Sequence, residues 1–490
     1  TDPETAETTT TYPTTTVSLT GGSIDGNVYG GGLGRMGKAA VAAQDAEGME
    51  GEEGYKPAVE AEDAITAVEA KVYGDVLVEL NKTDESNCIV NGSIFGCNNV
   101  NGSPQGCVTV HIYKTASTAG KPTKFTRAAY LAASDEERDT HGYELTAVYG
   151  GGNKAAYYPG VEAVRDTAQT HVIIDGCNFT SIRQVYGGGN AASTPATNVT
   201  IKSTYEIGEV FGGGNGKSTP TEVNPGANVG YLADTDDNGT PGTPYGTGYA
   251  QVNINGGTVH SVFGGSNTKG NVREVAVTML EEENVDGSAL CDLKVDEAYG
   301  GGKSAPMDGV ARLQLGCIPG VAEVYGGARE ADVNNDVVLT ITNGDYDKVY
   351  GGNNKGGIIK GTITVNITEI GCRQITIDEL YGGGNLAPYS KFGCTYNEIT
   401  GKWVANTEGT DNTEGAPYAI DVLVESCTSI GKVFGGGNES KSLSNTTVTL
   451  QGNTQVLRNV YGGGNQAEVL GRTTVRSPGP DAAWSTSSDS

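Results

Sequence analysis

The residues best suited to chemistry in this 490-residue sequence are carboxylates and an amide close together in one loop. Asp234, Asp236 and Asn238 precede Gly239, and oxygen ligands at alternate positions before a glycine are typical of a calcium-binding loop. The acid that an EF-hand requires twelve residues along is replaced by Tyr245. The three residues therefore predict either a calcium site weaker than an EF-hand or a solvated acidic turn, and no other cofactor is expected.

Acids that could cleave a glycan are expected to converge from neighbouring segments, two or three together. Glu209, Glu297 and Glu323 share a position two residues before a recurring aromatic residue, but the same position holds Gln184 and Lys348 elsewhere. This mixture is typical of a solvated position. The sequence therefore nominates no catalytic residue.

Histidine and cysteine give no catalytic or zinc pattern either. His171 and His260 belong to unrelated segments, no GxSxG motif occurs, and both histidines are expected to be structural. The nine cysteines include no CxxC pair. We expect most of them to be buried thiols, although Cys291 and Cys317 occupy equal places in successive repeats and could form a disulfide.

A short motif, Val-Tyr/Phe-Gly-Gly-Gly-Asn, recurs along the whole chain and organises everything else. Its twelve copies centre on the aromatics Tyr29, Phe95, Tyr149, Tyr186, Phe211, Phe263, Tyr299, Tyr325, Tyr350, Tyr381, Phe434 and Tyr461. The shortest spacings between them are 25 to 27 residues, which is the length of one coil of a parallel β-helix. The glycines and asparagine suit a tight turn.

Strand patterns precede each copy of the motif. Segments such as 198–204 and 251–257 alternate β-branched with polar residues, which predicts half-buried strands. An aliphatic residue recurs four positions before the aromatic, for example Ile207, Val259 and Leu457. Stacked coils would align these residues into ladders. We predict an all-β fold, a right-handed parallel β-helix or β-solenoid of about twelve coils.

The recurring aromatic is the candidate ligand-binding residue. If the strand alternates strictly, ten rings form an exposed stripe for stacking on sugars: Tyr29, Tyr149, Tyr186, Phe211, Phe263, Tyr325, Tyr350, Tyr381, Phe434 and Tyr461. The competing interpretation is that a bulge turns the rings inward to fill the end of the core.

The repeat defines one elongated domain over residues 17–470, between a threonine-rich strand or linker at 1–16 and a tail at 471–490. Extra residues are predicted to form insertions, mostly on one edge where they would present a binding surface. Their ranges are 33–72, 114–146, 216–249, 268–290 and 386–418.

The net charge of −27 disfavours binding to nucleic acid or to anionic lipid. No stretch approaches the roughly 20 apolar residues of a membrane span. The opening TDPETAETTTTYPTTT lacks the pattern of a leader, so we expect a mature or truncated secreted chain.

With its twelve glycine-rich copies, the chain resembles the β-solenoid surface proteins of bacteria, the adhesin-like group that includes filamentous haemagglutinins and autotransporter passengers. The resemblance is architectural and transfers no functional residue. It implies a non-enzymatic structural or adhesin-like role outside the cell or on the surface of a bacterium, with glycans or a host surface as partners and self-assembly end to end. A carbohydrate-active β-helix is the alternative.

Overall fold

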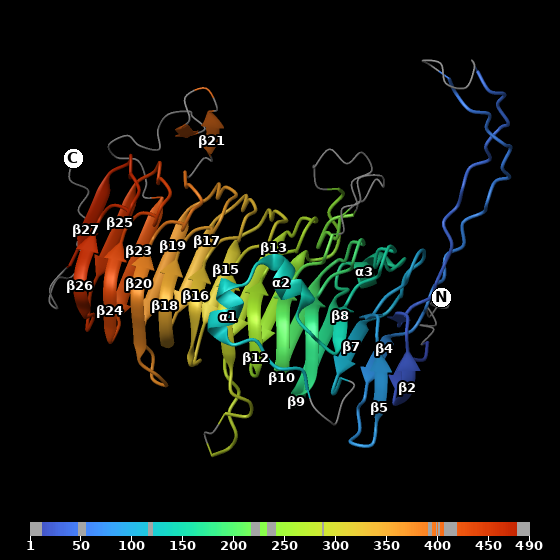
Figure 1. The fold of residues 1–490 in the computed structure, drawn as a ribbon, viewed down its shortest axis with the longest axis horizontal. Coiled ribbons are helices and arrows are strands. Elements are labelled where there is room, and N and C mark those ends of the chain that lie inside the picture. Colours follow the sequence, from blue (N-terminus) through green and yellow to red (C-terminus); the bar gives the residue numbers. More distant parts are fainter. Residues whose placement is uncertain are drawn as a thin grey trace, which may run out of the picture.

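The chain folds into one long parallel β-solenoid, seen in a computed structural model (Figure 1). The structure describes residues 12–47, 55–115, 121–216, 226–232, 242–286, 289–390, 394–397, 399, 402–405 and 419–477. Strands from successive coils lie side by side along the rod, and the chain advances from one end to the other in sequence order. The predicted fold class is confirmed.

Each coil contributes two strands, and strands of the same kind pair in parallel. Among the described residues, the first kind comprises β1 (Thr15–Leu19), β4 (Val76–Leu80), β7 (Val108–Ile112), the opening parts of β9 (Thr170–Tyr186) and β10 (Thr197–Phe211), β11 (Tyr249–Ile254), β13 (Glu274–Met279), β15 (Ala311–Leu315), β17 (Val337–Ile341), β19 (Ile363–Thr368), β23 (Ile420–Ser426), β25 (Thr446–Leu450) and β27 (Thr473–Arg476). We call these the leading strands.

The second kind, which we call the aromatic strands, ends on the ring of the motif. It comprises β3 (Val28–Tyr29), β6 (Ser93–Phe95), β8 (Leu145–Tyr149), the closing parts of β9 and β10, β12 (Thr258–Phe263), β14 (Lys294–Tyr299), β16 (Gly320–Tyr325), β18 (Gly344–Tyr350), β20 (Ile375–Tyr381), β24 (Ser429–Phe434) and β26 (Val456–Tyr461). Isolated bridges such as Met307 with Val333 form a short third side.

The remaining elements lie outside these two series. β2 (Gly21–Ile24) pairs with β5 (Asn87–Val90), and β21 (Cys394–Asn397) forms an antiparallel hairpin with β22 (Lys402–Ala405). Three short helices are α1 (Arg127–Ala132), α2 (Asp135–Thr140) and α3 (Glu162–Arg165). In Figure 1, α1 and α2 lie over the middle of the rod.

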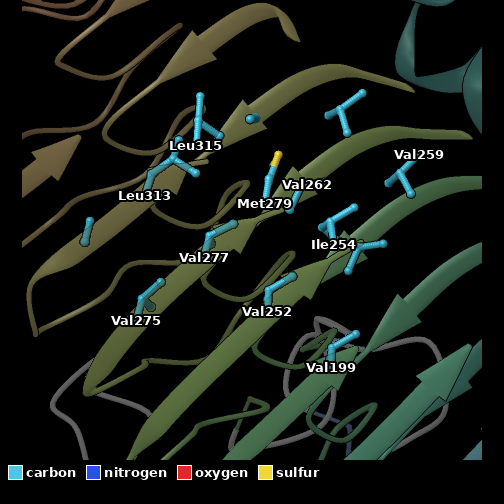
Figure 2. Packing of buried hydrophobic residues seen from close by; sticks show 14 of the residues in the cluster. Val199, Val252, Ile254, Val259, Val262, Val275, Val277, Met279, Leu313 and Leu315 are labelled. Atoms are coloured by element: carbon cyan, nitrogen blue, oxygen red, sulfur yellow. The ribbon is translucent and has the colours of Figure 1, made fainter. Parts of the chain in front are cut away.

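The core is a set of aliphatic ladders inside the coils. Along the leading strands, buried and half-buried residues alternate, and Val199, Val252 and Val277 occupy one register position in successive coils (Figure 2). The aromatic strands add Ile207 and Val259 from the opposite side. Because each coil buries these residues only against its neighbours, the core exists only as a stack.

One predicted core residue is misplaced. Val456, not Leu457, pairs with Ile430, and the side chain of Leu457 is 59% exposed. The register shifts between Ile430 and Lys432 because β26 has one residue more than its neighbour at that point. A one-residue shift turns a side chain from the core to the surface.

The twelve aromatic rings form one continuous stack along the rod. Neighbouring ring centroids lie 4.6 to 5.0 Å apart with nearly parallel planes. This spacing is the distance of about 4.8 Å between paired strands. The predicted aromatic ladder is confirmed, and its rings form a cluster separate from the aliphatic core.

The glycines are required because neighbouring coils touch at the turn. A Cβ on Gly351, the first glycine of its motif, would lie 2.3 Å from the carbonyl oxygen of Gly382 and 2.7 Å from Ile363 Cγ2. A Cβ on Gly383, a second glycine, would lie 2.8 Å from the backbone nitrogen of Gly437 in the next coil. Only hydrogen fits between backbones at these positions.

The asparagine that closes the motif forms a ladder of side-chain amides. Asn190 donates to Asn153 and Asn215 donates to Asn190, each at 2.8 Å. A second run joins Asn354 and Asn385 at 3.0 Å and continues toward the C-terminal end. These bonds link coils through side chains, as amide ladders do in stacked strands.

The insertions leave the stack at two different corners. Residues 33–72, 216–249 and 386–418 follow the glycine turn in the sequence, whereas 114–146 follows a leading strand. Parts of these ranges stay in the stack, because Val72, Val229 and Tyr389 pair with neighbouring coils on the third side. The predicted insertion 268–290 is shorter than expected, because Val272 and β13 within it also pair with neighbouring coils, which leaves the segment between β13 and β14, again after a leading strand. The solenoid also includes Thr15 and extends to Arg476, beyond the predicted limits of 17 and 470.

Replacing Gly383 with alanine is expected to destabilise the protein by about 1–3 kcal/mol, because the added carbon must push two coils apart. The matched control is Gly463→Ala, which changes the same motif position in the last coil, where a Cβ would meet no atom within 4 Å. Urea unfolding followed by circular dichroism measures both. Equal midpoints for the two variants would contradict the proposed contact between coils.

Candidate ligand-binding cleft

The expected stripe of exposed rings is not present in the described structure. Eight of its ten candidates are buried, at most 6% exposed: Tyr149, Tyr186, Phe211, Phe263, Tyr325, Tyr350, Tyr381 and Phe434. Each ring is covered by the ring above and the ring below, so no free face remains for a sugar. Only the end rings reach solvent, with Tyr461 42% exposed and Tyr29 half-buried.

Hydroxyl groups at the ring edges are also satisfied by the protein. Tyr325 donates to Glu323 at 2.7 Å, and Asn354 donates to the Tyr299 hydroxyl at 2.9 Å. Burial raises the pKa of the Tyr186 hydroxyl well above its usual value. The rings are therefore structural. They form a cluster of their own, whereas the bulge interpretation had placed them at the end of the aliphatic core.

The predicted calcium ligands Asp234, Asp236 and Asn238 lie outside the described residues, so that site stays a prediction. Within the described ranges, no three His, Cys, Asp or Glu side chains gather in a way that could hold a metal ion.

The insertion that carries α1 and α2 packs on the aromatic strands and creates the most distinctive site of the molecule. The buried Tyr130 of α1 places its hydroxyl 2.8 Å from Ser261 Oγ on β12. Arg138 of α2 lies over the Tyr130 ring and donates to Glu297 on β14 at 3.0 Å. Ser134 and Glu137 form a capping box that starts α2.

Two cations interrupt the asparagine ladder where this insertion docks. Lys303 and Arg329 occupy the ladder position between Asn267 and Asn354. Arg329, almost fully buried, donates to both carboxylate oxygens of Asp135 at 2.7 and 3.0 Å, which holds the start of α2. A planar guanidinium suits such a two-point contact better than an amide.

A buried histidine lies under the first residues of the insertion. His260 on β12 is 1% exposed, with Nδ1 2.7 Å from Asp296 and Nε2 2.9 Å from Glu206. Its ring stacks on Tyr130 at 4.4 Å. Arg127 donates to the second oxygen of Asp296 at 2.9 Å. Burial lowers the pKa of His260, but the hydrogen bonds and charges of both carboxylates outweigh it, so the net pKa is raised.

Above this histidine lies a cleft of about 680 Å³. One wall is formed by residues 124–127 of the helical insertion, and the other by Glu281, Ala289 and residues 292–293 of the second insertion. The floor comes from β12, β14, β16 and β18, through residues that include Thr258 and Asp345. A volume of 300–1,000 Å³ is typical of ligand sites.

The charged groups of the cleft divide into bonded and unbonded sets. Arg127 pairs with Asp296, and Arg373 pairs with Glu281 at 2.8 Å. Lys124 and Lys294 make no ion pair among the described residues.

Two disulfides lie beside the cleft and brace part of its lining. Cys177 bonds to Cys291, beside the wall residues 292–293, and Cys317 bonds to Cys372, beside the lining residues Pro319 and Arg373. The alternative of a disulfide between Cys291 and Cys317 is therefore wrong, because the second insertion carries Cys291 back to Cys177 on β9, with 5.8 Å between the Cα atoms of these two residues.

The expectation of buried thiols holds for only part of the cysteine set. Cys88, Cys97 and Cys427 are buried free thiols, and burial raises the pKa of Cys427 to about 12. Cys107 is free but exposed.

Sequence reasoning missed the cleft because no motif marks it. The usable signal was departure from the repeat, because Lys303 and Arg329 replace the asparagine of the ladder. His260 was expected to be structural, and it lies buried between two carboxylates that are 54 and 36 residues away in the sequence.

Comparison with protein-family models, with curated proteins and with solved structures found no match. The fold and the cleft therefore define the chain as a parallel β-solenoid with a lateral, disulfide-braced cleft. Within the described residues, no helix is both long and apolar enough to cross a bilayer.

The raised pKa of His260 predicts a pH-dependent stability. A base whose pKa is higher in the folded than in the unfolded protein stabilises the folded state. This stabilisation is fully present below the unfolded pKa, near 6.5, and is lost as the pH rises through the pKa of the folded state. Each unit of elevation corresponds to about 1.4 kcal/mol. Urea unfolding between pH 5.5 and 9 should show this decline in the native protein and not in His260→Gln.

His171→Gln is the control for that measurement. Burial lowers the pKa of His171, so its contribution has the opposite sign and is lost as pH falls. If His260→Gln keeps the slope of the native protein, the charged histidine does not stabilise the docked insertion.

Proposed function

We propose that this chain is a non-enzymatic, adhesin-like β-solenoid that binds glycans in the lateral cleft. The observation that carries the proposal is the cleft itself: two insertions from different coils form its walls, and two disulfides brace one wall and part of the remaining lining. Hydroxyl and charged side chains line it together with the half-buried ring of Phe125. Polar groups with an aromatic surface suit a sugar ligand.

The state of the acids favours binding over cleavage. A glycosidase needs two carboxyl groups facing the sugar, one of them free to give a proton. At this cleft Asp296 is bonded to His260 and Arg127, and Glu281 is bonded to Arg373. Acids already held by cations of the protein are poor proton donors. A carbohydrate-active enzyme would therefore have to use the two exposed acids of the lining, Asp292 and Asp345.

The disulfides also support a location outside the cell. Such bonds persist in oxidising compartments and are rare in the cytosol. The proposed role is at a bacterial surface, where the rigid rod presents its cleft to glycans of a host or of neighbouring cells.

The test is calorimetric titration of the full chain with cellotetraose, chitotetraose, tetragalacturonate and a heparin tetrasaccharide. At least one should bind, and Ala289→Trp, which fills one wall of the cleft, should weaken that binding more than tenfold. Ala128→Trp, on the exposed face of α1 outside the lining, should leave the affinity unchanged.

The same samples are incubated and assayed for new reducing ends. Their appearance would support the enzymatic alternative and refute the non-enzymatic role. Absence of binding by all four sugars would refute glycan binding at this cleft.

Both ends of the rod support a second part of the proposal, self-association end to end. Among the described residues, β1 is the first leading strand at one end of the stack and β27 the last at the other. Leu470 and Val475 are 55% and 45% exposed at one end. Strand edges at the ends of a stack can pair with another chain.

Light scattering should therefore show assemblies larger than one chain at high concentration. The double variant Leu470→Lys with Val475→Lys should shift these assemblies to monomers, because joining two chains would bury the charged lysines at the paired strand edge. Leu386→Lys, at a residue 48% exposed but inside the stack, is the control and should not change the assembly. A native chain that is monomeric at all concentrations would contradict this part.

A further inference from the structure

We infer that the cleft selects acidic sugars, whose carboxylate or sulfate group is bound between Lys124 and Lys294. This inference rests on the proposed glycan binding and names the class of glycan. It depends on the two lysines, on the hydroxyl group of Thr258 beside them, and on the ion pairs that every other cation of the cleft forms with acids of the protein.

Lys124 and Lys294 approach the same point from different elements. Lys124 belongs to the helical insertion, and its ammonium group donates to Thr258 Oγ1 at 3.2 Å. Lys294 begins β14 and lies opposite Thr258 of β12 in the parallel register. Side chains at paired positions of parallel strands point to the same face, so both lysines lie at the same part of the cleft as Thr258. The Thr258 hydroxyl, which accepts from Lys124, still has a hydrogen to donate.

The protein does not neutralise these two charges within the described structure. Lys124 lies over the Tyr205 ring at 4.2 Å and donates to Thr258 Oγ1, and neither contact supplies a negative charge. Burial lowers the pKa of Lys124, and the charge of Lys294 lowers it further, although Glu206 acts in the opposite direction. Two cations that repel each other at the edge of a cleft are relieved by an anion placed between them.

The other cations of the cleft do not compete for the ligand. Arg127 and Arg373 already hold Asp296 and Glu281. The exposed acids Asp292 and Asp345, also in the lining, disfavour a ligand with negative charge along its whole length. The best match is therefore a sugar chain with one acidic group at the lysines and hydroxyl groups elsewhere.

The experiment uses the full chain and calorimetry with three probes: tetragalacturonate for carboxylate, a heparin tetrasaccharide for sulfate, and cellotetraose as the neutral sugar. One acidic probe should bind at least tenfold more tightly than cellotetraose. Lys124→Gln with Lys294→Gln should reduce the affinity for that probe about ten- to a hundredfold, as expected for lost hydrogen bonds to a charged group. Affinity for cellotetraose should stay the same.

Lys348→Gln is the matched control, because this lysine lies on the neighbouring β18 outside the cleft lining, 3.9 Å from Glu323. Lys124→Arg with Lys294→Arg should retain the preference for acid. The urea midpoints of all variants should match that of the native chain.

The outcomes separate the two proposals. If cellotetraose binds and Ala289→Trp removes that binding, but acidic probes bind no more tightly, the cleft binds glycans and the inference about acid is overturned. If an acidic probe binds and the glutamine pair leaves its affinity unchanged, the lysines are not the site. If no sugar binds, both the proposed function and this inference fail.

Discussion

The close contact between backbones at the glycine turn is the constraint on which the whole rod depends. Ring centroids in neighbouring coils are never more than 5.0 Å apart, and at this distance a β-carbon on Gly351 or Gly383 has no room. Aliphatic ladders, stacked rings and amide ladders are all possible only because the coils keep this spacing. The repeated glycines are therefore a packing requirement more than a requirement for unusual backbone angles.

The candidate site arises where the repeat is altered. Helices α1 and α2 dock on the aromatic strands where Ser261 contacts Tyr130 and Arg329 binds Asp135. Lys303, which like Arg329 replaces the ladder asparagine, binds Glu209. The charges brought together in this way leave His260 enclosed by two carboxylates, and two lysines without ionic partners. The candidate site therefore lies where residues differ from the repeat pattern.

Sequence reasoning predicted the fold well because stacking repeats the same local signal. The alternation in β11 or the glycines after Phe211 identify their structure without knowledge of distant residues. Sequence reasoning could not decide whether the rings are exposed, because the residues that cover each ring belong to neighbouring coils and to the insertion. It also misassigned Cys291, whose partner Cys177 is 114 residues away and is reached only through the path of a loop. The cleft shares this difficulty, since its two walls come from insertions more than 130 residues apart in sequence.

The disulfides have a mechanical consequence for a rod under tension. A force along the axis acts directly on the hydrogen bonds between coils. Coils would therefore unfold one at a time from an end, and each unfolded coil would lengthen the chain. The bond between Cys177 and Cys291 spans 114 residues, and the bond between Cys317 and Cys372 spans 55. Chain inside either loop cannot lengthen the tether while its bond is intact. Extension is therefore confined to the coils outside the loops and to the short stretch between them. The parts of the cleft floor on β12, β16 and β18 lie inside the loops and cannot lengthen the tether under load.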